Sequence, residues 1–440
     1  MSLKQAFGSF LWASMESLVL KGISFFVIAI ISRWIGPSEY GLIGIISIFM
    51  LIGNALVDSG LSASLIRSKN VDDVDYSTVF YVNIIISIFL YVFIFAAAPI
   101  IAEYFKEVKL VLFVRVYCLI FIIRALSAVH LARLIKLMQF KKIALIAMPS
   151  TIIGSIFGLI MAFNECGAWS IVAMYMATDI IMNGLLWFHS GWLPSLVFSR
   201  YKLIQHWSFG YKLFISSILN QLFDNIYTIL IGRSYSMEIL GYYDRAKKFN
   251  EYPSTSMTSV ITRVTYPLLS RVQDDRQRLT HTYRELIRFS FFIMAPLMLG
   301  AAAISRPLFL ILLGSSWERA VPFFQILSLS AMFYPIHALN ITILKVVGRS
   351  DLFLKLEMLK KVAFILPIIV GFKFGIEGLL WCSVLVSLIN LLINIHFSSK
   401  FIDYNMQMQL KDAFPILVAS GLMYFIMYSV LLGMQNIHSL

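Results

Sequence analysis

Four polar residues lie within one long apolar run near the middle of the chain. They are Gln221, Asp224, Asn225 and Thr228. In a continuous helix their spacing of i, i+3, i+4 and i+7 places all four on one face. A polar stripe on an otherwise apolar helix of membrane length is expected to face the protein interior rather than lipid. The Asp224 carboxylate could hold a coupling H⁺ or Na⁺ or contact substrate hydroxyls. An interhelical hydrogen-bonded clamp is an equally good explanation.

Positively charged side chains also occur within apolar runs. A charge at the centre of a bilayer costs about 2.5–3.5 kcal/mol on insertion scales, so each needs a reason to be there. A cavity lined by such cations would suit a diphosphate, because arginine can bind phosphate through two parallel hydrogen bonds. The alternative is that these side chains reach the membrane interface or form structural ion pairs. The residues expected to form such a cationic substrate-binding cavity are Lys21, Arg124, Arg245, Lys248 and Arg263.

Two further acids and one histidine are candidates for a polar cavity or for coupling. Asp179 and Asn183, at i and i+4, could form a second, smaller stripe. Asp58 is a candidate too, although it could simply pair with Arg67 or Lys69 at the end of its run. His337 follows a proline in another apolar run, and a lone membrane histidine is more often a satisfied polar group than a proton relay.

Motifs for catalysis and metal binding are absent from the sequence. The seven histidines are scattered and form no HExxH pattern, and no GxxxxGK[ST] loop for nucleotide phosphates occurs. No nucleophile elbow is present either. The sequence therefore predicts a protein that is not an enzyme and has no cofactor and no metal site.

The hydrophobic composition of the chain indicates that membrane-spanning helices position these candidate residues. Of 440 residues, 59% are hydrophobic, and apolar runs of about 20 residues, each long enough to cross a bilayer as a helix, recur along the chain. These features predict an all-α polytopic membrane protein. The net charge of +13 is then explained by Lys and Arg at the cytoplasmic face rather than by nucleic acid.

Hydrophobic patterning predicts thirteen spans, of which the eighth has a polar first half and is expected to be broken or kinked at Pro253. An N-terminus in the cytoplasm puts 22 of the 36 Lys and Arg residues on that side and 7 outside, which favours this orientation. The predicted outer loops are short and leave no room for a separate catalytic domain. The predicted spans are 8–32, 41–66, 76–101, 110–132, 143–163, 168–188, 211–232, 240–269, 285–304, 320–344, 358–374, 378–397 and 413–433.

Two hairpins recur at nearly the same offset. GPSEYGLIG, with Gly41, is echoed by MEILGYYDRA, with Gly241, and GAWS at Gly167 is echoed by GIEGLL at Gly375. The pattern predicts two six-helix lobes in a parallel pseudo-twofold repeat around a central cavity, an architecture suited to alternating access. Chance similarity of glycine-rich hairpins is the alternative. The predicted parts are an N-terminal lobe at 1–188, a cytoplasmic linker at 189–210, a C-terminal lobe at 211–397, and an additional C-terminal helix within 398–440.

Several motifs together resemble one family. They are Tyr40-Gly41-Leu42, DSGLSASLIRSKN at 58–70, NQLFDNIYTILIGR at 220–233, LGYYDRAKK at 240–248 and ITRVTYPLLSRVQDD at 261–275. Over about 1–400 the chain resembles the polysaccharide transporter branch of the multidrug/oligosaccharidyl-lipid/polysaccharide superfamily, in particular Wzx-type exporters of the colanic acid kind. That family usually has twelve or fourteen spans. Because thirteen spans are predicted here, the sequence leaves undecided whether a fourteenth follows at the C-terminal end.

The resemblance implies a function. It implies a flippase that moves undecaprenyl-pyrophosphate-linked oligosaccharide from the cytoplasmic to the periplasmic leaflet of a bacterial inner membrane. Its products would be exopolysaccharide, capsule or O-antigen. The implied partners are this lipid-linked oligosaccharide, membrane lipids, and a polysaccharide polymerase with its chain-length regulator.

Two other functions fit parts of the sequence. A multidrug exporter of the same superfamily should have an acidic or apolar cavity, which the membrane-embedded Arg and Lys residues disfavour. A membrane polysaccharide polymerase or ligase should have a large periplasmic loop for catalysis, which the short predicted outer loops disfavour.

Overall fold

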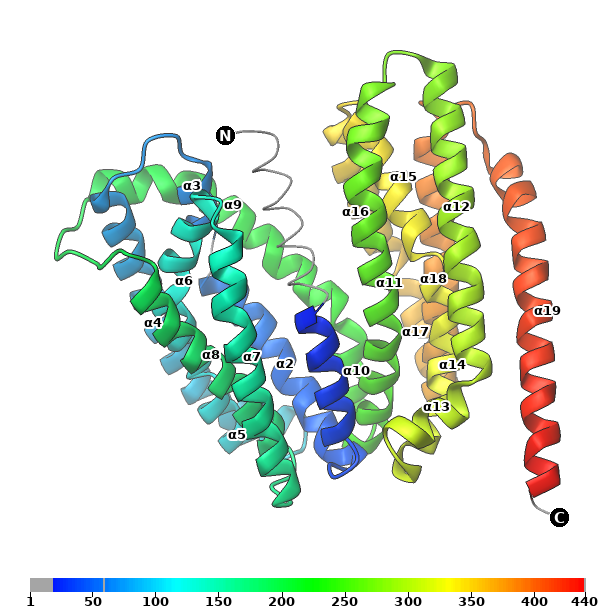
Figure 1. Ribbon diagram of the computed structural model, residues 1–440, viewed down its shortest axis with the longest axis horizontal. Helices are drawn as coiled ribbons and strands as arrows, with labels where there is room; N and C mark the ends of the chain where they lie inside the picture. The colour runs from blue at the N-terminus through cyan, green and yellow to red at the C-terminus, as the bar shows by residue number, and fades with distance from the viewer. Residues whose placement is uncertain (1–18, 58–59, 439–440) are drawn as a thin grey trace. The chain divides into compact units, whose positions relative to one another are not determined.

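The computed structural model describes residues 19–57 and 60–438, and every regular element within them is helical (Figure 1). The chain divides into two compact units, which we call unit 1 (Met1–Gly241) and unit 2 (Tyr242–Leu440). This division groups residues by contact, whereas the predicted lobes follow a repeat in the chain, so the predicted boundaries at 188, 210 and 397 stay a prediction.

Unit 1 contains a first helix at Val19–Ile31 and then the elements α2 to α10. Their bounds are α2 (Pro37–Val57), α3 (Leu61–Arg67), α4 (Asp73–Tyr104), α5 (Leu110–Tyr117), α6 (Ile120–Lys136), α7 (Phe140–Phe163), α8 (Trp169–His189), α9 (Arg200–Asp224) and α10 (Ile226–Ser234). The next helix, α11 (Met237–Arg271), begins in unit 1 and continues into unit 2.

Unit 2 contains the rest of α11 and the elements that follow it. They are α12 (Arg276–Ala303), α13 (Ser305–Leu312), η1 (Ser315–Ala320), α14 (Val321–Ala331), α15 (Tyr334–Val346), α16 (Ser350–Ala363), α17 (Ile365–Lys373), α18 (Gly375–Ser398) and α19 (Met406–His438). The core of this unit is built largely from α12, α15 and α18, and in it Phe291 of α12 stacks on Phe333, which directly precedes α15.

Among the described residues, eight helical segments are long and apolar enough to cross a membrane, and a ninth is obtained if the bent pair α9–α10 is one span. Eight predicted spans are confirmed as membrane-length apolar helices: 76–101, 110–132, 143–163, 168–188, 285–304, 320–344, 378–397 and 413–433. The predicted span 211–232 coincides with the bent pair. The protein is therefore a multi-pass all-α membrane protein.

The other four predicted spans are helical where the structure describes them, but they are shorter, more polar or interrupted. The first two contain the apolar helices Val19–Ile31 and Pro37–Leu51. Of the predicted break or kink at Pro253, the break does not occur, because α11 runs unbroken through Pro253 and Pro267, and the kink stays a prediction. The predicted span 358–374 covers α16 and α17, which are separated at Phe364. The total of thirteen stays a prediction.

The first turns of α2 and α11 cross at very short range. A Cβ atom added at Gly41 would lie 2.0 Å from the backbone oxygen of Met237, and one added at Gly241 would lie 1.9 Å from that of Pro37. Each glycine thus packs against the residue four positions before the other. The contact is reciprocal, as a twofold relation between the two hairpins would require, while the complete six-plus-six repeat stays a prediction.

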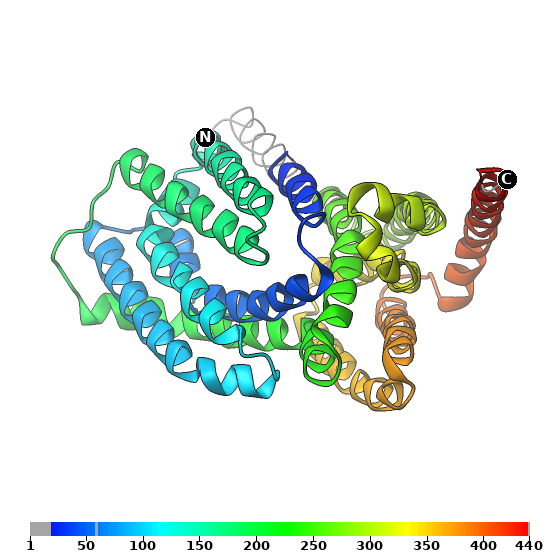
Figure 2. The same ribbon diagram turned by 90° about the horizontal axis from the view of Figure 1, so that it is seen from below.

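Polar contacts hold the N-terminal end of the last helix, α19, within unit 2. Arg284 of α12 donates from Nε and Nη2 to the two carboxylate oxygens of Asp412, at 2.5 and 2.8 Å. The Tyr404 hydroxyl donates to Asp412 Oδ2 at 2.9 Å. Seen from below, α19 lies at the edge of this unit (Figure 2).

A mostly apolar cavity of about 340 Å³ lies among α12, α15, α18 and α19.

Candidate functional site

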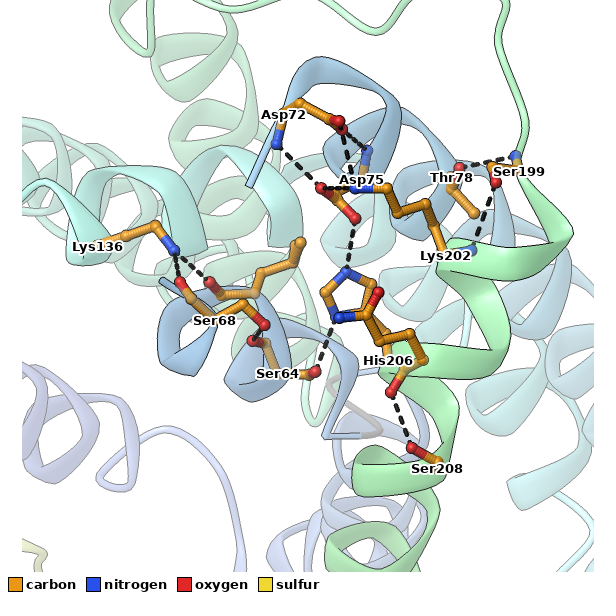
Figure 3. Close-up of polar contacts among 12 residues, drawn as sticks. Ser64, Ser68, Asp72, Asp75, Thr78, Lys136, Ser199, Lys202, His206 and Ser208 are labelled. Atoms are coloured by element: carbon orange, nitrogen blue, oxygen red, sulfur yellow. Dashed lines mark hydrogen bonds and ion pairs between the residues drawn. The ribbon is translucent and has the colours of Figure 1, made fainter. Parts of the chain in front are cut away.

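A polar network joins α3, α4 and α9 in unit 1 (Figure 3). It starts from the way α4 begins. The Asp72 carboxylate accepts from the Asp75 backbone N–H, and the Asp75 carboxylate accepts from the Asp72 N–H, both at 2.9 Å. This reciprocal capping box satisfies two backbone donors at the helix end. It also fixes the Asp75 side chain, which is only 2% exposed, toward α9.

His206 of α9 bridges two helices within this network. Its Nε2 lies 3.1 Å from Asp75 Oδ1, and its Nδ1 lies 2.8 Å from Ser64 Oγ of α3. Lys202, one turn earlier on α9, donates to Asp75 Oδ2 at 2.9 Å and to Asp72 at 3.2 Å. The hydrogen bond to the Asp75 carboxylate raises the pKa of Lys202 above its usual value. The buried carboxylate is therefore held by an ammonium on one oxygen and an imidazole on the other.

The segment before α9 is attached to α4 in the same region. The Ser199 backbone N–H donates to Thr78 Oγ1, and the Ser195 N–H donates to Ser77 Oγ, both at 3.1 Å. Lys136, at the end of α6, donates to the backbone oxygens of Leu65 and Ser68 (Figure 3). The segments near 65–75, 136 and 189–206, all predicted to be cytoplasmic, therefore meet at one end of unit 1.

The order Ser64, His206, Asp75 resembles a hydrolytic triad in composition only. Ser64 is 5% exposed, so its hydroxyl is out of reach of a substrate. A triad also needs donors for a developing oxyanion beside an accessible nucleophile. The geometry instead serves to hold α3, α4 and α9 together, because each residue comes from a different helix.

Two of the predicted site residues, Arg124 and Asp179, are brought together. Arg124 of α6 donates from Nε at 3.0 Å and from Nη2 at 2.8 Å to the same oxygen of Asp179 on α8. The Arg124 side chain is 34% exposed and that of Asp179 is 13% exposed. Asn183, one turn along α8, donates to the Ile123 oxygen of α6 at 2.5 Å. The geometry is that of a structural ion pair, which was the alternative to a cation lining the substrate cavity.

The predicted stripe of Gln221, Asp224, Asn225 and Thr228 does not lie on one continuous helix, and that prediction is wrong. The helix ends at Asp224 and resumes at Ile226 after a bend of 47°. At the break, Asn225 donates from its side-chain amide to the Gln221 backbone oxygen at 2.9 Å. Asp224 is exposed, whereas Asn225 and Thr228 are buried. The polar residues mark a break in the helix, and their role in coupling stays a prediction.

Two of the three cations predicted on α11, Arg245 and Lys248, have different surroundings in unit 2. Lys248 pairs with Asp244 one turn earlier, with Nζ 2.8 Å from Oδ2. Arg245 is 1% exposed, and its guanidinium carbon lies 5.3 Å from the centre of the Phe249 ring and 6.0 Å from that of Trp317. Arg245 thus belongs to an aromatic core, where cation–π contacts help to stabilise a buried guanidinium.

The remaining predicted residues lie apart from these groups or outside the described part of the chain. Lys21 is exposed on the first helix. Asp58 lies outside the described residues, and so does the side chain of Arg263, whose backbone is part of α11. The structure therefore brings together Arg124 with Asp179, and Gln221 with Asn225.

Sequence reasoning missed Asp75, Lys202 and His206. One signal could have found the first of them: two aspartates three residues apart directly before a long apolar run are a capping-box pattern. No local pattern connects Asp75 to His206, because 131 residues separate them along the chain.

The Arg124–Asp179 pair can be tested by a double-mutant cycle. We expect Arg124→Ala and Asp179→Asn each to destabilise the protein, and the two together to cost less than their sum, with a coupling of about 1–2 kcal/mol. Thermal unfolding of the purified protein in detergent measures this. Arg115→Ala, a change to another membrane-embedded arginine, is the control. If the single effects simply add, the pair does not contribute as a unit.

The sequence profile described as polysaccharide biosynthesis protein matches residues 30–322. The chain is 23% identical to the lipopolysaccharide biosynthesis protein WzxC of Escherichia coli, over 87% of this chain and 78% of that one. It is 22% identical to the teichuronic acid biosynthesis protein TuaB of Bacillus subtilis (98% and 90% covered) and 23% identical to the succinoglycan biosynthesis transport protein ExoT of Rhizobium meliloti (84% and 75%).

Solved structures share the fold. The lipid II flippase MurJ in an inward closed conformation superposes with a TM-score of 0.72 at 15% identity, covering 98% of this chain and 93% of that one. An inward-facing multidrug resistance MATE family transporter of the MOP superfamily superposes with a TM-score of 0.64 at 15% identity, covering 89% and 98%. The fold predicted from the sequence, that of this superfamily, is confirmed.

Proposed function

This chain belongs to the polysaccharide biosynthesis protein family, and we propose that it is a flippase for undecaprenyl-pyrophosphate-linked oligosaccharide repeat units. The observation that carries the proposal is the combination of this family with the fold of a lipid II flippase over nearly the whole chain. The substrate is amphipathic, and its sugar and diphosphate cannot cross hydrocarbon unaided. Polysaccharide assembly at the outer face therefore needs a protein that moves this substrate across the membrane.

The proposed direction is from the cytoplasmic to the periplasmic leaflet of a bacterial inner membrane. The N-terminus is cytoplasmic in this proposal, as the distribution of Lys and Arg favours. Transport proceeds by alternating access of two lobes around a central cavity, driven by an H⁺ or Na⁺ gradient or by substrate supply and removal. The protein itself performs no covalent chemistry. A polymerase and its chain-length regulator then consume the delivered repeat units.

The cationic residues are proposed to serve the diphosphate. Arg124 keeps about a third of its side chain exposed while it pairs with Asp179, so a diphosphate could compete for part of the guanidinium. Lys21, exposed on the first helix, is a second proposed contact, and Lys248 and Arg263 remain proposed for the same role. Arg245 is no longer proposed for it, because its side chain is buried among aromatic rings. A multidrug exporter is the second candidate, favoured by the MATE likeness. Cationic drugs would suit this set of residues poorly.

Deleting the gene tests the proposal. We expect lipid-linked repeat units to accumulate on the cytoplasmic leaflet, where a reagent added to intact spheroplasts cannot reach them. Expression of the wild-type chain should restore polysaccharide export. Single repeat units accumulating on the periplasmic side would instead indicate a missing polymerase. Normal export together with sensitivity to cationic drugs would favour a multidrug exporter.

A further inference from the structure

His337 lies between two residues of the neighbouring helix in unit 2. Its Nε2 is 3.2 Å from Ser387 Oγ, and its Nδ1 is 3.0 Å from the side-chain amide nitrogen of Asn394. Because an amide NH₂ can only donate, Nδ1 must accept, and the ring proton is on Nε2, directed at the serine hydroxyl. The imidazole is therefore neutral in this arrangement, and both of its nitrogens are satisfied.

The amide that donates to His337 is only half satisfied. Asn394 is completely buried, and its Oδ1 has no hydrogen-bond partner among the described residues. A buried polar atom without a partner costs about 1–3 kcal/mol, so it calls for an explanation. The orphaned atom is an acceptor, and it belongs to the same planar group as the nitrogen that faces the histidine.

We propose that His337 and Asn394 form a proton-binding site, in which the Asn394 amide turns over when His337 Nδ1 is protonated. In the neutral state the amide NH₂ donates to Nδ1. In the protonated state the orphaned Oδ1 accepts the new N–H, while Nε2–H still donates to Ser387. The proton comes from water on one side and returns to water on the other, and no covalent bond of the protein breaks. This inference rests on the proposed function, because it names H⁺ as the coupling ion.

The surroundings favour H⁺ over a metal cation. Hard metal cations are held by several oxygen ligands, usually including carboxylates. Here the groups in contact with one another are the His337 imidazole, the Ser387 hydroxyl and the Asn394 amide. The positive charge of Lys360 on α16 is close enough to His337 to interact with it electrostatically. The Lys360 ammonium itself pairs with Glu357 at 2.8 Å. On α12, Arg288 lines the same cavity as Ile336, the residue directly before His337.

The site lies within membrane-length helical segments of unit 2. Both helices lie within membrane-length segments, Ser315–Val346 and Gly375–Ser398. His337 is partly exposed, and Tyr334, one turn earlier on the same face of α15, is 47% exposed. His337 lies about 12 Å before Lys345 along the helix, so it is inside the apolar layer rather than at its rim.

Histidine-selective ¹⁵N NMR of the purified full chain tests the site without any transport assay. At neutral pH we expect His337 in the neutral form with its proton on Nε2, and on acidification we expect an imidazolium signal. The His337→Gln variant assigns that signal. In Asn394→Leu, which lacks the turning amide, the imidazolium should be lost at the same pH. A His337 that stays neutral down to the lowest pH at which the protein is folded would overturn the proposal. An unchanged titration in Asn394→Leu would do the same.

A transport assay in vesicles with an imposed pH gradient completes the test. The wild-type rate should change several-fold with the gradient, whereas His337→Gln should keep downhill translocation and lose that response. His396→Gln, at an exposed histidine two residues beyond Asn394 on α18, is the matched control and should behave as wild type. A full gradient response in His337→Gln contradicts the inference. If the wild-type chain translocates nothing, the proposed function fails, and the NMR titration still decides the proton site.

Discussion

Replacing Gly241 with valine is expected to prevent α2 and α11 from packing and to abolish transport. The first side-chain carbon would lie 1.9 Å from the Pro37 oxygen and 3.2 Å from the Gly41 nitrogen. All of these neighbours are backbone atoms, which cannot move aside as the end of a flexible side chain can. Overpacking of well-packed sites costs about 1–3 kcal/mol and occasionally more, and we expect this site to exceed that range because the clash is with backbone.

The measurement is the midpoint of thermal unfolding and the amount of folded protein recovered from membranes. Gly41→Val should have a similar effect, because its Cβ would lie 2.0 Å from the Met237 oxygen. The matched control is Gly36→Ala in the same hairpin, where an added Cβ meets nothing within 4 Å. A Gly241→Val protein that unfolds at the wild-type temperature would show that the two helices do not cross at this distance.

Replacing Asp75 with leucine is the second change with a large expected effect. The substitution leaves Lys202 and the buried His206 without their carboxylate and removes half of the capping box. Removing one partner from a buried charged pair typically costs about 3–5 kcal/mol, and a lost helix cap adds about 1 kcal/mol. We therefore expect a strong decrease in stability, even though the membrane-spanning parts of the chain are unchanged.

Two variants make this prediction specific. Asp73→Ala, at an exposed aspartate on the same turn, should leave the unfolding midpoint nearly unchanged. The double variant Asp75→Leu with His206→Leu should regain part of the lost stability, because apolar side chains then replace both members of the pair. If the double variant is no more stable than Asp75→Leu, His206 does not depend on the Asp75 carboxylate.

The overall class of fold could be predicted from the sequence because apolar length is a local property. Eight predicted spans coincide with membrane-length helices and a ninth with the bent pair α9–α10, since each needs only a run of apolar residues. The pairing of Gly41 with Gly241 was visible as a repeat in the chain. The close crossing between them was not, because the sequence does not tell which helices touch.

The candidate site was predicted less well, for physical reasons. The stripe around Asp224 assumed an unbroken helix, and helical periodicity gives no warning of the bend at Asn225. Arg124 and Asp179 were both identified, yet their pairing depends on packing between helices 55 residues apart in sequence. Arg245 was expected in a polar cavity, whereas the structure surrounds it with aromatic rings.

The central claim, translocation of a lipid-linked oligosaccharide, is tested most directly by reconstitution. The purified chain is placed in liposomes that contain an undecaprenyl-pyrophosphate oligosaccharide with a fluorescent, chemically reducible label. A membrane-impermeant reductant should then quench nearly all of the label, because the protein exchanges it between leaflets, compared with about half in protein-free liposomes. An ordinary labelled phospholipid should remain half protected. Half protection of the oligosaccharide lipid in the presence of folded protein, or equal loss of both labels, would contradict the account.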